Sequence, residues 1–140
     1  MRIVLDTNVL VAGLLNPTGA CGRLLDLVLE GIVQPCVDGR ILREYENVLR
    51  RQHLELPASP VADALDFLRH FGEYIAAVPL AASLPDPDDL PFLEVAAFAQ
   101  ADLVTGNLRH FPKRACRPVR VITPAECLER LRRSPGSAAG

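Results

Sequence analysis

The sequence contains no tryptophan and few other aromatic residues. Aromatic residues make up 5% of its 140 residues, whereas hydrophobic residues as a class make up 49%. A hydrophobic core is therefore expected, built mainly from aliphatic side chains. Because so many residues are apolar, the chain does not have the composition of a disordered protein. Its length is typical of a single domain.

Long hydrophobic runs are also missing from the sequence. No apolar segment reaches the roughly 20 residues that a membrane-spanning helix needs. The first residues hold one arginine and a very short apolar run before Asp6, which is not the pattern of a secretory signal peptide. We therefore predict a cytoplasmic protein that does not associate with a membrane.

The cysteines form no metal-binding pattern. The four of them contain no C-x-x-C pair, and no histidine lies at the spacing of a zinc site. We expect reduced thiols, because disulfides are rare in cytosolic proteins. The four residues are Cys21, Cys36, Cys116 and Cys127.

The chain has no overall basic character, because its net charge is −2 at pH 7. Its positive charges are nevertheless almost all arginine, which suits bidentate contacts with phosphate groups. The arginines gather in three segments, at 40–51, 113–120 and 130–133. A solvated surface face is the simpler interpretation of each segment, and a phosphate-binding surface is the alternative.

Short β-like runs alternate with longer helical runs along most of the chain. This alternation predicts an α/β fold, a three-layer α/β/α sandwich around a parallel sheet of four to five strands. Residues 1–133 are expected to form one domain, with a flexible tail at 134–140. The predicted strands are 3–5, 32–37, 74–78, 103–105 and 119–123, and the predicted helices are 21–29, a segment capped by Asp38, 61–71, 92–101 and 124–133.

Polar residues follow the ends of several predicted strands. Asp6 comes directly after the first strand, and Asn107 comes shortly after the fourth. Glu44 lies at the edge of the apolar face of its helix, and the loop 84–91 carries three aspartates before a buried helix. Because parallel strands end at one edge of a sheet, we expect these groups to converge there.

Carboxylates gathered in one site repel one another and need a counter-charge. Oxygen ligands without cysteine or histidine favour Mg²⁺ or Mn²⁺, and such an ion suits the hydrolysis of a phosphodiester by an activated water. Each acid also has a structural interpretation. Asp6 fits a turn residue, Glu44 fits an exposed helix residue, and Asp88 or Asp89 fits a helix cap.

Four ordered blocks of the sequence resemble the PIN-domain family, which includes ribonuclease toxins of toxin–antitoxin modules. The blocks are IVLDTNVL, LREYENVL, DPDDLPFLEVAAFAQADLVTGN and LVTGNLRHFP, and they cover roughly residues 1–125. The resemblance implies that Asp6, Glu44 and Asp89 hold the metal and are catalytic. It also implies a subgroup that is marked by a D-P-D-D loop, here residues 86–89.

One position departs from the family pattern. Many members carry a fourth aspartate where this chain has Asn107, which offers a neutral oxygen and no charge. The resemblance implies that Asn107 orients the metal or a water. Asp88, as a supporting residue, and Glu94 are two alternatives for supplying the missing charge. These candidate ligands are compatible with one bound metal ion or with two.

The same resemblance implies several supporting residues. Thr7 and Asn8 are expected to shape the turn after the first strand and to hydrogen-bond the metal-binding carboxylates. Thr105 is expected to hydrogen-bond a phosphate or an acid. For His110 a structural role is the alternative to binding nucleic acid. The expected nucleic-acid contacts are Arg43, Arg109 and His110.

The main prediction is therefore a Mg²⁺- or Mn²⁺-dependent endoribonuclease of the toxin type, with RNA as substrate, an antitoxin as partner and a homodimer as assembly. The alternative is a PIN-like module that binds RNA or protein with little catalysis, which is a possibility because of Asn107. A haloacid-dehalogenase type of phosphotransfer is disfavoured, because that chemistry needs a second aspartate where this chain has Asn8. A dinucleotide-binding fold is disfavoured because no G-x-G-x-x-G follows the first strand.

Overall fold

A computed structural model describes residues 1–134, so most of the predicted tail at 134–140 lies outside the described residues. Within them, parallel strands form one central sheet in the order β3-β2-β1-β4-β5. The predicted parallel sheet is confirmed. The strands are β1 (Arg2–Leu5), β2 (Gln34–Val37), β3 (Glu73–Tyr74), β4 (Asp102–Val104) and β5 (Val121–Ile122).

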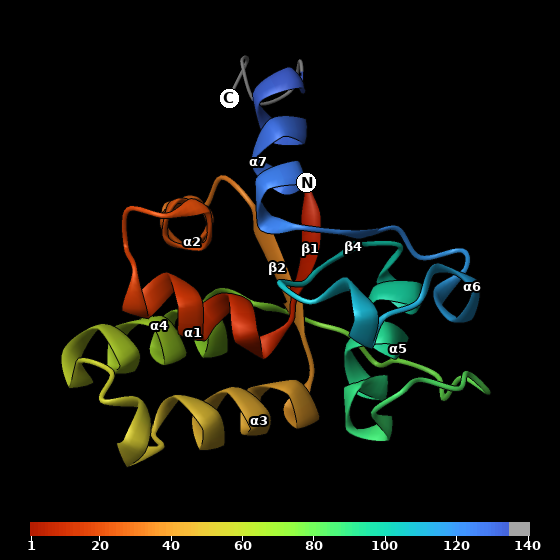
Figure 1. Cartoon of the computed structure of the whole chain (residues 1–140), viewed down its shortest axis with the longest axis horizontal. Coiled ribbons are helices and arrows are strands. Elements are labelled where there is room, and N and C mark those ends of the chain that lie inside the picture. The colour runs from red at the N-terminus through yellow and green to blue at the C-terminus, as the bar shows by residue number, and fades with distance from the viewer. Residues whose placement is uncertain (135–140) are drawn as a thin grey trace.

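Helices cover both faces of this sheet, which confirms the predicted three-layer sandwich. Figure 1 shows α1 and α4 on one side of β1 and β2, and α5 and α6 on the other. No helix in residues 1–134 combines the length and the apolar character that crossing a membrane requires. The helices are α1 (Thr7–Leu15), α2 (Ala20–Leu29), α3 (Gly39–Leu49), α4 (Ala58–Phe71), α5 (Leu90–Ala99), α6 (Lys113–Cys116) and α7 (Pro124–Arg133).

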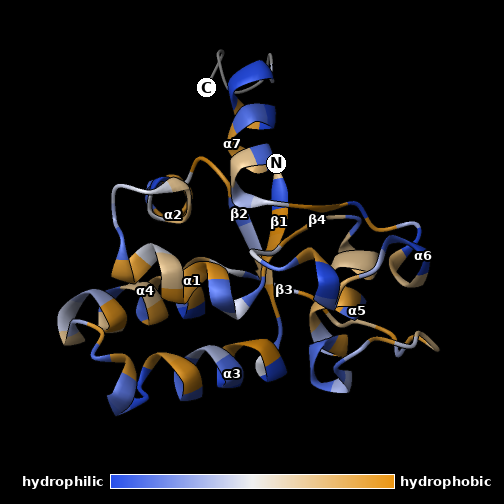
Figure 2. Cartoon of the chain, in the orientation of Figure 1, coloured by the Kyte–Doolittle hydropathy of each residue, from blue (hydrophilic) through white to orange (hydrophobic). Residues whose placement is uncertain are grey.

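The core is aliphatic, as the composition predicts. Ile3, Val4 and Leu5 of β1 are fully buried, and β4 is buried along its whole length. Figure 2 shows hydrophobic colours in β1 beyond its hydrophilic beginning near the N-terminus. The prediction that α5 is buried on nearly all sides is correct for most of its length, but Phe98 is 55% exposed. The closely packed central strands thus fix the positions of the residues that follow their carboxyl ends.

Helix α1 was not predicted, and the predicted turn at Thr7 and Asn8 is wrong. Both residues lie in the first turn of α1, which begins directly after Asp6. The segment TNVLVAGLL is apolar on nearly every side, so it lacks the alternation of polar and apolar faces that reveals a helix in a sequence. Burial of Val9 and Leu10 against the sheet layer stabilises this helix.

Three predicted strands are shorter than expected. The strand predicted at 32–37 begins only at Gln34. The segment 74–78 pairs only at Glu73–Tyr74 and through the N–H of Ile75, which donates to the carbonyl of Val37 at 2.9 Å. The segment 119–123 pairs only at Val121–Ile122, because Thr123 begins α7 as its N-cap. The Thr123 hydroxyl accepts from the N–H of Glu126 at 3.1 Å in a capping box.

A network of ion pairs joins α3 to α5. Glu94 on α5 is 4% exposed and accepts from Arg40 Nη1 at 2.6 Å and from the N–H of Leu80 at 2.8 Å. Arg40 also donates to Oδ2 of Asp38, at 2.9 Å from Nε and 2.7 Å from Nη2. Asp38 caps α3, as predicted, by accepting from the N–H of Ile41. Both carboxylate oxygens of Glu94 are therefore engaged, which accounts for a glutamate in this apolar helix.

We expect Arg40→Ala to lower the free energy of unfolding by about 2–3 kcal/mol at pH 7, because it leaves the buried Glu94 carboxylate without its cation. The double variant Arg40→Ala/Glu94→Gln should recover part of that loss, since a neutral amide is cheaper to bury. Denaturant unfolding measures both values. Arg50→Ala, which removes an exposed pair with Glu46, is the control and should cost less than about 0.5 kcal/mol. Equal losses for Arg40→Ala and the control would contradict this account.

Candidate functional site

The carboxyl ends of β1 and β4 lie side by side at one edge of the sheet. Leu5 pairs with Val104 in the register of these strands, and the N–H of Asp6 donates to the carbonyl of Val104 at 2.9 Å. Asp6 and Thr105, which follow the two strands, are thereby neighbours. This is the edge at which ligands bind in open parallel sheets.

Asp6 is a buried carboxylate that is held from the neighbouring strand end. Its side chain is at the N-terminus of α1 but makes no capping hydrogen bond there. Thr105 Oγ1 instead donates to Asp6 Oδ2 at 2.8 Å. Burial raises the pKa of Asp6 above its ordinary value of 3.8, and the hydrogen bond from Thr105 opposes that rise. Asp6 thus has a fixed orientation in a site that disfavours its charge.

Glu44 reaches the same edge of the sheet from α3. It is half-buried, one residue before the buried Tyr45, which agrees with its predicted place at the edge of the apolar face. The hydroxyl of Thr7 donates to Glu44 Oε2, so the first turn of α1 holds this carboxylate. Burial is the main cause that raises the pKa of Glu44, and the negative charge of Asp6 adds to it.

Asp89 is the least satisfied acid of the group. It lies in a short 3₁₀ helix, Pro87–Asp89, and is 8% exposed. Among residues 1–134, its Oδ2 is the one buried side-chain oxygen or nitrogen without a hydrogen bond. His110 Nδ1 lies 3.3 Å from this oxygen, without the alignment of a hydrogen bond. Burial first, and then the charges of Asp6 and Asp86, raise the pKa of Asp89 from 3.8 to about 6.

Two other polar residues shape the loop after β4. Asn8 Oδ1 accepts from the N–H of Gly106 at 3.1 Å, so Asn8 holds this loop and does not bond a carboxylate as we expected. Asn107 Oδ1 accepts from the N–H of Arg109 at 3.2 Å and thereby caps a second 3₁₀ helix, Leu108–His110. The side-chain oxygen of Asn107 is thus bound to its own loop.

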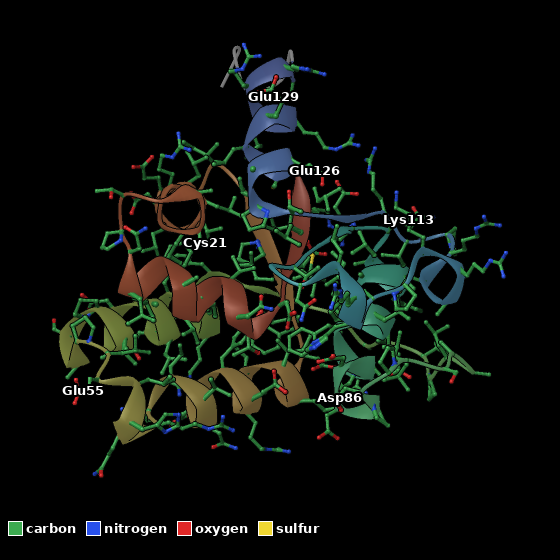
Figure 3. All side chains as sticks on the ribbon, viewed as in Figure 1. Cys21, Glu55, Asp86, Lys113, Glu126 and Glu129 are labelled. Carbon is green, nitrogen blue, oxygen red and sulfur yellow. The ribbon has the colours of Figure 1, made fainter. Side chains whose placement is uncertain are left out.

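The remaining aspartates of the loop lie on the exposed side of the site. Asp86 Oδ1 accepts from the N–H of Asp88 at 2.9 Å and so caps the 3₁₀ helix Pro87–Asp89. Asp89 occupies the N-cap position of α5, one of the two that we predicted, but its side chain makes no capping hydrogen bond there. Figure 3 shows Asp86 where the ends of α3 and α5 approach each other. Asp88 is exposed, and its charge contributes to the raised pKa of Glu44. These groups strengthen the negative potential of the site.

The three basic residues that we expected to contact nucleic acid are at least partly exposed, and one of them, His110, lies beside an acid. Arg43 is exposed on α3, and Arg109 is exposed in the 3₁₀ helix that begins after Asn107. His110 ends that helix, half-exposed and beside Asp89. The contact between His110 and Asp89 was not predicted, because the two residues are distant in sequence and only the turn of the loop after β4 brings them together. The network around Arg40 was missed for the same reason.

The acids fit a hydrated divalent ion better than an ion in a closed protein cage. Within residues 1–134, no three or more His, Cys, Asp or Glu side chains form a group that could hold a metal ion as they are placed here. Asp6 and Glu44 are nonetheless close enough to Asp89 for their charges to raise its pKa. Mg²⁺ typically keeps several waters and binds through one or two carboxylates. The oxygen donors and the unpartnered oxygen of Asp89 suit such an ion.

We expect Asp89→Asn to stabilise the metal-free protein at pH 7. The pKa of Asp89 is raised to about 6 in the folded state, so its protonated form stabilises the fold fully below pH of about 4, and that contribution is lost as the pH rises through 6. A shift of two units corresponds to at most about 3 kcal/mol. Denaturant unfolding in a chelator should therefore show a gain at pH 7 and none at pH 4.

The exposed Asp26 provides the control for this prediction. Asp26→Asn should change the free energy of unfolding by less than about 0.5 kcal/mol at either pH. If Asp89→Asn is no more stable than the wild type at pH 7, the buried charge of Asp89 does not destabilise the fold.

Comparison with known proteins identifies the family. A model of the PIN domain matches residues 2–109. An uncharacterized protein of Methanocaldococcus jannaschii is 27% identical over 110 residues, which are 76% of this chain and 71% of that protein. The crystal structure of VapBC2 from Rickettsia felis, bound to a DNA fragment from their promoter, has a similar fold, with a TM-score of 0.58 and 17% identity over 88% of this chain and 98% of that one. The chain therefore belongs to the PIN domain family.

Proposed function

We propose that the protein is a divalent-metal-dependent endoribonuclease, the cytoplasmic toxin of a toxin–antitoxin pair. PIN domains are generally nucleases, which supports hydrolysis of a phosphodiester. The observation that carries the proposal is the buried and unpartnered Oδ2 of Asp89, beside the like charges of Asp6 and Glu44. A buried carboxylate oxygen in this state is costly unless a proton or a cation neutralises it.

Asp6, Glu44 and Asp89 would hold Mg²⁺ or Mn²⁺ directly or through water. The ion would supply an activated water and would stabilise negative charge on the phosphoryl oxygens of the substrate. The protein contributes the orientation of the donors. Thr105 donates to Asp6 and Thr7 donates to Glu44, so two of the three carboxylates are restrained from rotating.

The negative charge of RNA would be met by the segment that leaves the site after β4. No aspartate or glutamate occurs between Asp102 and Glu126, and this stretch carries five Arg and Lys residues. Arg120 is engaged by Asp102 at 2.9 Å, whereas Arg109 begins the stretch next to the acids. Figure 3 shows Lys113 at the beginning of α6, further along the same segment. We propose that the RNA backbone follows this segment, with Arg43 as a contact on α3.

A second candidate function is a binding module with little catalysis. The observation in its favour is the hydrogen bond from the N–H of Arg109 to the oxygen of Asn107, because it occupies one lone pair of that oxygen and holds the side chain against its own loop. We also propose a cognate antitoxin and a homodimer as partners. The similar fold of VapBC2 supports an assembly of this kind. An antitoxin with a basic side chain would offset the charge of the acids.

The nuclease proposal predicts that purified protein, free of any inhibitor, cleaves single-stranded RNA in Mn²⁺ and not in a chelator. Asp6→Asn should lower the cleavage rate at least about 100-fold, because it removes a donor from the metal site. Asp26→Asn is the matched control and should retain wild-type activity. Intact RNA together with a protein that binds no Mn²⁺ would refute the proposal, whereas Mn²⁺ and RNA binding without cleavage would favour the binding module.

A further inference from the structure

The loop after β4 supplies a nitrogen donor to the acidic site, where the sequence offered only oxygen. His110 is the last residue of the 3₁₀ helix that Asn107 caps. The hydrogen bond from the N–H of Arg109 to Asn107 Oδ1 keeps the asparagine oxygen on its own loop. The same cap fixes the start of the helix, whose far end carries the imidazole to Asp89. Of these two residues of the loop, His110 and not Asn107 therefore has its side chain beside an acid.

The contact between His110 and Asp89 is unusual for a simple ion pair. His110 Nδ1 lies 3.3 Å from Asp89 Oδ2, yet the two atoms do not have hydrogen-bond geometry, and Oδ2 is buried without any other partner. The side chain of His110 is 44% exposed. In the neutral tautomer that carries its proton on Nε2, Nδ1 has a lone pair, so Nδ1 and Asp89 Oδ2 can both act as ligand atoms for one cation.

The separation of the two atoms suits a shared cation. Two ligand atoms that each lie about 2.1 Å from an ion, at right angles to each other, are about 3.0 Å apart. The observed 3.3 Å between Nδ1 and Oδ2 needs only a small rotation of either side chain to reach this value. A second observation also points to a ligand. Asp89 is only 8% exposed, and its Oδ2 has no hydrogen-bond partner.

We propose that Nδ1 of His110 binds the divalent ion together with Asp89 Oδ2, which makes the metal site of this chain a mixed nitrogen and oxygen site. The proposal rests on the metal-dependent function proposed above and adds a ligand to it. Between the two ions considered, an imidazole nitrogen is tolerated better by Mn²⁺ than by Mg²⁺, which prefers oxygen more strictly. His110 would therefore favour Mn²⁺ over Mg²⁺, and it adds a neutral ligand from the loop in which Asn107 supplies none.

The test is electron spin-echo spectroscopy of Mn²⁺ bound to the full chain, because an imidazole nitrogen on the ion modulates the echo whether or not RNA is cleaved. We expect nitrogen modulation in the wild type and its loss in His110→Gln. His53→Gln is the matched control, since His53 is exposed in the 3₁₀ helix Gln52–Leu54, and it should keep the modulation. Absence of modulation in the wild type, or its persistence in His110→Gln, would overturn the proposal.

A second variant separates ligand loss from misfolding. His110→Asp replaces the nitrogen by oxygen, so it should still bind Mn²⁺ without nitrogen modulation, and its affinity for Mg²⁺ relative to Mn²⁺ should rise by about tenfold. An unchanged ratio would contradict the role of His110. If Mn²⁺ binding requires Asp6 but the echo shows no nitrogen modulation, the proposed nuclease site stands and only the role of His110 as a ligand is rejected. A wild type that binds no Mn²⁺ would reject both.

Discussion

Repulsion among carboxylates at one edge of a parallel sheet is the constraint on which the site depends. Asp6 follows β1, Glu44 comes from α3 and Asp89 precedes α5, so three separate elements bring like charges into one poorly solvated place. Burial raises the pKa of each of them, and the neighbouring charges add to the effect at Glu44 and Asp89. His110 opposes the rise in the pKa of Asp6 and Asp89, but burial and the like charges outweigh it and both pKa values stay raised. A divalent cation would relieve this remaining repulsion.

The surrounding structure keeps the acids in place against this repulsion. The two threonines donate to Asp6 and Glu44, and Asn8 ties the loop after β4 to the start of α1. The pair between Arg40 and Glu94 joins α3 to α5, which are the helices adjoining Glu44 and Asp89. Beneath these polar contacts lies an aliphatic core that is closely packed around β1 and β4. The site is thus strained electrostatically but is carried by rigid elements, as pre-organised metal sites require.

Much of this arrangement follows from the sequence, and the exceptions have physical causes. The parallel sheet, the cap at Asp38 and the position of Glu44 were predictable because each depends on local periodicity or on a single side chain. Helix α1 escaped prediction because its apolar residues surround it on all sides. The partners of Glu94 and the approach of His110 to Asp89 depend on contacts between distant segments, which spacing along the chain does not reveal. The D-P-D-D subgroup stays a prediction.

The central claim, that a metal ion neutralises this group of acids and takes the place of the proton on Asp89, is tested most directly by calorimetric titration of Mn²⁺ at pH 6 in two buffers of different ionisation enthalpy. The account predicts that binding releases protons, because Asp89, whose pKa is raised to about 6, is partly protonated at this pH and must ionise to bind a metal. The measured heat should then differ between the buffers, and Asp6→Asn should bind far more weakly. Equal heats in both buffers, or no binding by the wild type, would contradict the account.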